Sequence, residues 1–260
     1  MKYALKEEWH TLWRSRQLWI AIVGMCSLNW ILAGYYMRLF PDEDIVYYFQ
    51  LINVDAPMVV SYSICACAYA WIYCKEKQTN SITYIVPRIG IRNYVTIRTG
   101  IGFFAGFIVL FLGKIMFVYS ASFFYPLLLE NGSSIRQYAG EGWGLSKLLL
   151  QGNSWGYFVW TFGVQGLLAG VLCVAAQTFS LFVKYQAFVI GFPVVLNYLV
   201  YNYLDSFLHV PSCLSWLCIY DASNPYFSDG KQLVFTCIYT GVLILVLWCI
   251  SYKHVKKEFS

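Results

Sequence analysis

The ionisable side chains of this sequence are spaced too widely for the common catalytic and metal-binding arrangements. The three histidines, His10, His209 and His254, lie in separate segments, and no H-E-x-x-H or G-x-S-x-G motif is present. The Gly113-Lys114 pair lacks the other positions of a phosphate-binding loop and falls inside an apolar run. The residues therefore predict no metal site, no cofactor and no ATP site in this chain.

Lys114 is the only charged residue that falls deep within a long apolar run. A charge in such a position is a candidate functional group by default, although a lysine can also extend its amine toward the end of the run. The apolar runs contain no acid or histidine to pair with it, which argues against a proton-coupled carrier. The polar candidates for lining a pathway through the apolar runs are Asn29, Lys114, Gln165, Gln177 and Asn197.

Composition places these residues in a membrane protein. Of the 260 residues, 59% are hydrophobic and only 12% are charged, which is about half the usual charged share of a soluble domain. Disordered, collagen-like and secreted disulfide-rich classes are excluded, and a net charge of +5 gives no reason to expect nucleic acid as a partner. Cys213 and Cys218 fall in an expected outer loop, where a disulfide is one open possibility.

Six apolar runs are long enough to cross a bilayer as helices, which takes roughly 20 residues each. Most of the 18 Lys and Arg residues flank these runs on the side that also holds both chain ends, which predicts cytoplasmic N- and C-termini. We therefore expect an all-α, multi-pass protein of the cell membrane, with residues 1–260 forming one domain and residues 125–153 and 205–232 lying outside. The six runs are approximately Leu18 to Met37, Pro57 to Cys74, Gly100 to Phe124, Ser154 to Val183, Gln186 to Leu204 and Leu233 to Tyr252.

Residues 1–17 predict an amphipathic helix that lies in the membrane interface before the first run. Apolar residues from Leu5 to Trp13 recur at helical spacing, with charged residues on the other side. Such a helix serves either as an elbow that moves with the first crossing or as a passive anchor. The elbow residues are Trp9, Leu12, Trp13, Arg14 and Arg16.

Two G-x-x-x-G spacings, Gly102 to Gly106 and Gly166 to Gly170, occur inside the third and fourth apolar runs. Glycines at this spacing let two helix backbones approach closely, because no side chain separates them. The motif predicts tight helix packing at these positions. The spacing leaves open whether the neighbouring helix belongs to the same chain or to a second one.

The segment 75–99 follows the second apolar run and is the most informative part of the sequence. It begins with charged residues, and apolar residues from Ile82 to Ile89 then recur at i, i+3, i+4 and i+7, which predicts a short amphipathic helix. Pro87 is expected to end or bend this helix, because proline disfavours helical geometry in the preceding residue. A short helix projecting from a membrane protein suggests a docking element, and a solvated, positively charged loop is the alternative.

The order of these features resembles the membrane subunit of a type-2 ATP-binding-cassette transporter. The corresponding loop of that family reads like E-[KR]-x-x-G-T-L-x-x-[LI]-x-x-x-P, with Asn80 here where glycine is usual and a longer segment 125–153 than the family has. The resemblance implies a coupling helix that docks on an ATPase, and a partly re-entrant outer segment 205–232. The coupling residues would be Glu76, Lys77, Asn80, Ser81, Ile82, Ile85, Val86 and Pro87.

The resemblance also implies a function. The chain would be the permease half of an exporter for an amphipathic peptide, antibiotic or lipid-like substrate, and would itself be no enzyme. ATP and Mg would be bound by a separate ATPase subunit, and a second permease, identical or related, would complete the pathway in the lipid membrane. The small size is similar to bacterial permeases that export antimicrobial peptides. The alternatives are a non-transporting scaffold, an ion-coupled carrier, and a membrane-embedded enzyme that would use His209, Asp205 or Asp221.

Overall fold

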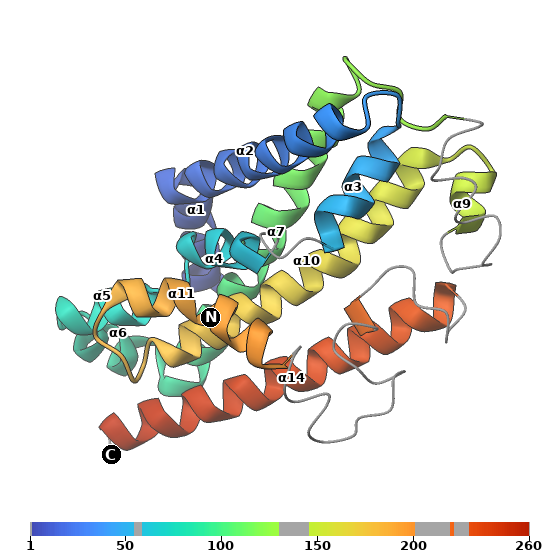
Figure 1. The fold of residues 1–260 in the computed structure, drawn as a ribbon. Helices are drawn as coiled ribbons and strands as arrows, with labels where there is room; N and C mark the ends of the chain where they lie inside the picture. Colours follow the sequence, from blue (N-terminus) through green and yellow to red (C-terminus); the bar gives the residue numbers. More distant parts are fainter. Residues whose placement is uncertain (1, 55–58, 130–145, 201–218, 221–228, 260) are drawn as a thin grey trace.

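The computed structural model describes residues 2–54, 59–129, 146–200, 219–220 and 229–259 (Figure 1). Every regular element of these residues is a helix, which confirms the all-α class for this part of the chain. The helices are α1 (Lys2–Arg14), α2 (Arg16–Leu39), α3 (Ile45–Val54), α4 (Val60–Cys67), α5 (Ile72–Gln78), α6 (Ile82–Ile89), α7 (Ile91–Ala121), α9 (Ser146–Leu150), α10 (Ser154–Phe179), α11 (Gln186–Leu199) and α14 (Asp229–Phe259).

Four of the described helices are long and apolar enough to cross a membrane: α2, α7, α10 and α14. They correspond to the first, third, fourth and sixth apolar runs of the sequence. Their outer faces expose large apolar side chains, including Ile31 in α2 at 71% and Leu245 in α14 at 63%. An apolar surface of this kind is compatible with a protein embedded in lipid.

The second apolar run does not form one long helix. The chain is already helical from Ile45 in α3, and it continues through α4 and α5 with a turn at residues 68–71. In that turn the amides of Ala68 and Tyr69 donate to carbonyls three residues back, so the backbone remains paired although the helix is interrupted. Residues 45–54, which belong to none of the six apolar runs, also form a helix, and Ile45 and Phe49 of α3 are fully buried in the core.

The fifth apolar run is described only in part. Its first 14 residues form α11, which contains Pro193, and residues 201–204 lie outside the described residues. Most of the expected outer segments 125–153 and 205–232, including Cys213 and Cys218, lie outside them as well.

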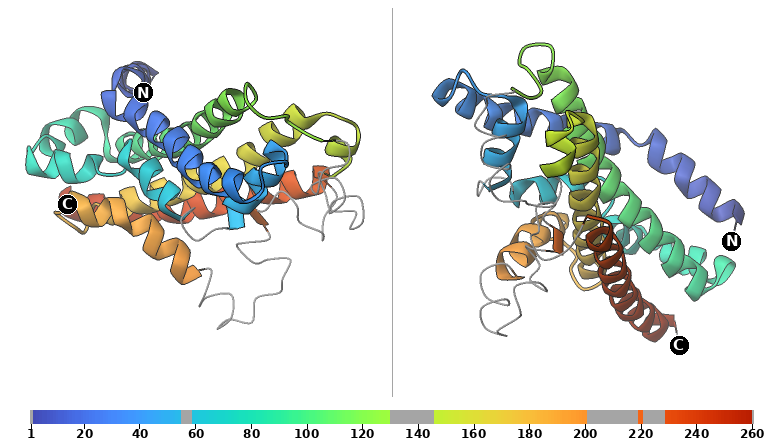
Figure 2. Two further views of the ribbon diagram at one scale, coloured as in Figure 1. Left: turned by 45° about the horizontal axis from the view of Figure 1, so that its top comes forward. Right: turned by 90° about the vertical axis from the view of Figure 1, so that its right-hand side faces the viewer.

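The centre of the fold is the contact between α7 and α10, with α2 and α14 on opposite sides of this pair (Figures 1 and 2). A Cβ atom on Gly106 would lie 2.7 Å from the backbone oxygen of Ala169, and one on Gly170 would lie 2.5 Å from the ring of Phe103. Both G-x-x-x-G spacings therefore pack α7 and α10 of the same chain against each other, which answers the question that the spacing left open.

Different structural elements lie at the two ends of the helix bundle. One end holds α5, α6 and the C-terminal end of α14, whereas the turn before α3 and the segment after α7 lie at the other (Figure 1). At this second end, the buried carboxylate of Asp44 accepts hydrogen bonds from the amides of Tyr47 at 2.8 Å and Leu129 at 3.1 Å. Asp44 thus caps the start of α3 and joins the segment after α7 to it.

Candidate functional site

Helices α5 and α6 and the turn between them form a helical hairpin over residues 72–89, which we call the knob. Asn80 in the turn has a φ of 52°, a left-handed conformation that asparagine and glycine adopt far more readily than other residues. The hydroxyl of Thr83 donates to the carbonyl oxygen of Asn80 at 2.6 Å and holds the turn against the start of α6.

Helix α6 is amphipathic, as its spacing predicts, and its apolar face is turned into the protein. Ile82 and Val86 are buried in a cluster with Tyr94 of α7, Leu181 and Val255 of α14. Pro87 lies inside the helix, which continues to Ile89 and ends at Gly90. Of the two expectations for Pro87, that it ends the helix is wrong, because its missing amide removes only one bond in the last turn, and that it bends the helix stays a prediction.

The burial of the knob decides which residues a partner can touch. Of the eight predicted coupling residues, Glu76, Ile82 and Val86 are buried and cannot form a docking surface, while Asn80 and Pro87 are exposed. Lys77, Ser81 and Ile85 are partly exposed. The exposed side of α6 adds Thr83, Tyr84 and Arg88, which the sequence analysis missed. These residues occupy the positions between the apolar ones, so the helical period itself could have identified them.

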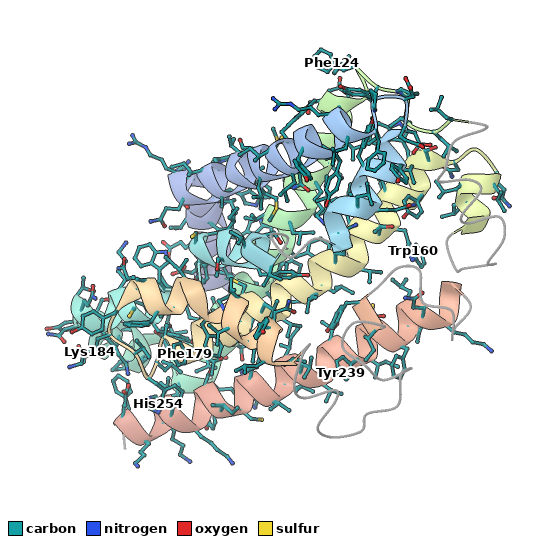
Figure 3. The ribbon with its side chains drawn as sticks, viewed as in Figure 1. Phe124, Trp160, Phe179, Lys184, Tyr239 and His254 are labelled. Carbon is teal, nitrogen blue, oxygen red and sulfur yellow. The ribbon has the colours of Figure 1, made fainter. Side chains whose placement is uncertain are left out.

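The knob also contacts the connection between α10 and α11 and the C-terminal end of α14. Nζ of Lys77 lies 2.7 Å from the carbonyl oxygen of Leu181 and 2.5 Å from Oε1 of Glu258 in α14. The side-chain amide of Gln78 donates to the backbone oxygen of Lys184 at 3.1 Å. Lys184 and His254 lie at this same end of the bundle (Figure 3). A force on the knob would therefore act on the connection between α10 and α11 and on α14 as well as on α7.

Arg98 of α7 joins three separate parts of the chain in one buried ionic network. Its Nη1 lies 2.5 Å from Oε2 of Glu8 in α1 and 2.7 Å from the hydroxyl of Tyr69, while its Nη2 pairs with Oε1 of Glu76 in α5. The hydroxyl of Tyr94 donates to the other oxygen of Glu76. Helix α1, the knob and α7 are thus connected through one guanidinium group, which can bind carboxylates on two edges.

The electrostatics of this network make it sensitive to the loss of any member. Arg98 and Glu76 are each only 5% exposed. Burial raises the pKa of the Glu76 carboxyl, and the charge of Arg98 and the hydrogen bond from Tyr94 act in the opposite direction. Removing one partner of such a buried pair typically costs about 3–5 kcal/mol, because it leaves an uncompensated charge. The ion pair between Glu76 and Arg98 therefore holds the knob in position against α7.

The segment before the first long helix forms α1, and its apolar side packs on α7. Leu12 is buried, and the ring of Trp9 meets the ring of Phe104 edge-on at 5.8 Å. Ser15 separates α1 from α2, and its hydroxyl caps α2 by accepting from the amide of Leu18. The remaining elbow residues lie outward, with Trp13 half-buried and Arg14 and Arg16 exposed.

The five pathway candidates have different hydrogen-bond partners. Lys114 is fully buried, and its Nζ lies 2.5 Å from Oε1 of Gln165, so the structure brings two of the five together. Gln177 donates instead to the backbone oxygen of Arg98, and Asn29 donates to the backbone oxygen of Met25 within α2. Asn197 lies in α11, away from the other four along the chain.

Lys114 has a second polar neighbour that the sequence analysis missed. Oδ1 of Asn53, at the end of α3, lies 3.0 Å from Nζ, and the rings of Phe49 and Phe162 lie 4.9 and 5.9 Å from it. Asn53 was missed because it belongs to none of the six apolar runs. The lysine does not extend to the end of its helix.

Comparisons with protein-family models, curated proteins and solved structures gave no match. Within the described part of the chain, no three His, Cys, Asp or Glu side chains are placed to hold a metal ion. The candidate enzyme residues His209, Asp205 and Asp221 lie outside the described residues.

Proposed function

We propose that this chain is the permease subunit of an ATP-binding-cassette exporter in the cell membrane, driven by a separate ATPase that docks on the knob. The observation that carries the proposal is the attachment of the knob to α1 and α7 through Arg98. A projecting helix can drive a membrane protein only if its displacement reaches the helices that enclose the pathway. Glu76 and Arg98 supply that connection with a buried ion pair.

The proposed mechanism requires the ATPase to bind two permease conformations with different affinity, because only differential binding shifts an equilibrium. Closure of the ATPase on ATP and Mg moves the exposed side of α6, around Tyr84 and Arg88. The buried side of α6 and the Glu76–Arg98 pair pass this displacement to α7. Helix α7 packs along α10 through the glycine contacts, so both helices move together.

The proposal includes a complete topology of six crossings with both ends in the cytoplasm. The segment from Pro57 to Cys74, which contains α4 and the start of α5, would form the second crossing, and the segment beginning with α11 would form the fifth. The rest of the knob would then lie in the cytoplasm. Interrupted helices are accommodated in membranes where the freed backbone groups are buried in protein. A second permease subunit, identical or related, would complete the pathway for an amphipathic substrate, as in the bacterial peptide exporters that the chain resembles.

The experiment that tests the proposal is purification of the chain from its native membrane in mild detergent, followed by assay and identification of any bound ATPase. Tyr84→Ala combined with Arg88→Glu should remove the ATPase and leave the permease folded, because both side chains are exposed. Tyr119→Ala combined with Arg38→Glu is the matched control, since it makes the same changes at exposed positions near the other end.

The outcomes separate the proposed function from its main alternative. Co-purification of a vanadate-sensitive ATPase with wild type and control, and its loss from the Tyr84 and Arg88 variant, supports the permease. Purification without any ATPase would overturn the proposal and favour a non-transporting scaffold. Protease accessibility of Asn80 from the exterior of intact cells would also overturn it, because the knob must face the ATPase.

A further inference from the structure

We propose that Lys114, Asn53 and Gln165 form a buried site that binds the anionic group of the transported molecule, so that the substrate is an amphipathic carboxylate. The identity of this ligand as a substrate rests on the proposed transport function. The binding itself does not, because it requires no ATPase and can be measured on the permease alone.

The first observation is a buried charge whose described neighbours are neutral. Lys114 is 0% exposed, and its contacts are two amide oxygens and two aromatic ring faces. Among the described residues no carboxylate forms an ion pair with it. Amide oxygens and ring faces solvate an ammonium group without neutralising it, which leaves the site attractive to an anion.

The second observation is the capacity of the site to donate hydrogen bonds. Each of the Asn53 and Gln165 side chains carries an NH₂ group beside the oxygen that now faces Lys114. A half-turn of either amide would replace an acceptor by a donor, so an incoming carboxylate could be bound by the ammonium and by both amides. Gln50, one turn before Asn53 in α3, holds its Nε2 buried with no hydrogen-bond acceptor among the described residues.

The third observation is the aromatic contact beside the site. Helix α3 lies beside α10, and Phe49 meets Phe162 edge-on at 5.0 Å (Figure 1). Separation of these two rings would open the site toward the apolar part of an amphiphile.

The experiment measures binding of two matched fluorescent probes to the purified chain in lipid nanodiscs. The probes are a nitrobenzoxadiazole-labelled dodecanoic acid and its primary amide, which differ only in charge, and empty nanodiscs correct for partition into lipid. We expect saturable binding of the acid with a clear preference over the amide. Lys114→Met should weaken binding of the acid about tenfold or more, the typical contribution of one charged hydrogen bond, and leave the amide unchanged.

Two further variants distinguish recognition from folding. Lys114→Arg should retain most of the preference, because it keeps the charge, while Lys184→Met removes an exposed lysine and should have no effect. Thermal unfolding of each variant shows whether a lost preference accompanies a lost fold. If Lys114→Met unfolds, Gln165→Leu supplies the second test, because it keeps the charge but removes one amide that would bind the carboxylate. Binding of the acid should then weaken, and an unchanged affinity for the acid would contradict the site.

Three results would overturn the proposal. Equal binding of the two probes by wild type would show that the site does not recognise an anion. An unchanged preference in folded Lys114→Met would place recognition elsewhere. A preference that appears only in Asp55→Asn would identify Asp55, a residue outside the described part of the chain, as a resident counterion. None of these results would affect ATPase docking on the knob, so failure of this inference is distinguishable from failure of the proposed function.

Discussion

Arg98 of α7 and Glu8 of α1 form an ion pair of 2.5 Å across 90 positions of the sequence. The same guanidinium binds Glu76 at the base of the knob. Helix α1 and the knob, which the sequence suggests as two independent features, are therefore joined by one ionic network. The free energy of unfolding should therefore depend more on whether the charge of Arg98 is balanced by Glu8 and Glu76 than on the number of contacts among them.

Arg98→Met should destabilise the fold by about 3–5 kcal/mol, because it leaves the buried carboxylate of Glu76 without its cation. Addition of Glu76→Gln to this variant should recover part of the loss by removing the uncompensated charge. Unfolding in a gradient of denaturing detergent measures both variants. Equal stabilities for wild type and Arg98→Met would show that the network contributes nothing to the free energy of unfolding.

The exposed pair of Lys77 and Glu258 should behave differently from the buried network. Its side chains are 29% and 35% exposed, so solvent screens the attraction between them. Glu258→Gln should change the free energy of unfolding by less than about 1 kcal/mol, and salt should reduce this effect further. The same unfolding assay at low and high salt checks the prediction, and a loss as large as that of Arg98→Met would contradict it.

Substitutions at Asn80 should rank by their tolerance of a positive φ. Asn80→Gly should be close to neutral, whereas Asn80→Val should cost about 1–2 kcal/mol, because a β-branched side chain clashes in the left-handed region. Thermal unfolding of the three proteins gives the order directly. An unchanged stability in Asn80→Val would mean that the turn adopts another conformation.

The glycines of α10 offer a matched pair for testing its contact with α7. Gly170→Val should destabilise the protein by about 1–3 kcal/mol or prevent folding, because its Cβ would overlap the Phe103 ring. Gly163→Val places the same side chain on the same helix, where nothing lies within 4 Å of the new Cβ. The two variants are compared by size-exclusion chromatography and unfolding. Similar behaviour of both would contradict the close packing of the two helices.

Substitutions on the buried face of α6 should lower stability, whereas substitutions on its exposed face should not. Ile82→Asp buries a carboxylate in the cluster with Tyr94 and Val255, so it should lower the unfolding temperature markedly. Tyr84→Asp changes a side chain that is 74% exposed and should leave the unfolding temperature close to that of wild type. If Ile82→Asp leaves stability intact, the buried face of the knob has been wrongly assigned.

The amphipathic period of α6 and the apolar runs of α2, α7, α10 and α14 could be read in advance, because each is a property of neighbouring residues. Helix α3 could not be predicted in this way, because its local sequence pattern is weak. Its apolar stretch is short and is followed by Asn53 and Asp55, so it resembles a loop until tertiary contacts bury Phe49. The expected docking set also needed correction, because an apolar stripe on a projecting helix can face either a partner or the protein itself.

The sequence by itself determined an all-helical, apolar chain with a short amphipathic helix after a charged stretch, since hydropathy and periodicity are local. Only the tertiary structure decided that Arg98 pairs with Glu8 and Glu76, and that Lys114 is held by Asn53 and Gln165. Each of these contacts joins residues from separate helices. Which helices become neighbours is set by packing over the whole chain, for example at Gly106 and Gly170, and not by the spacing of residues within any one segment.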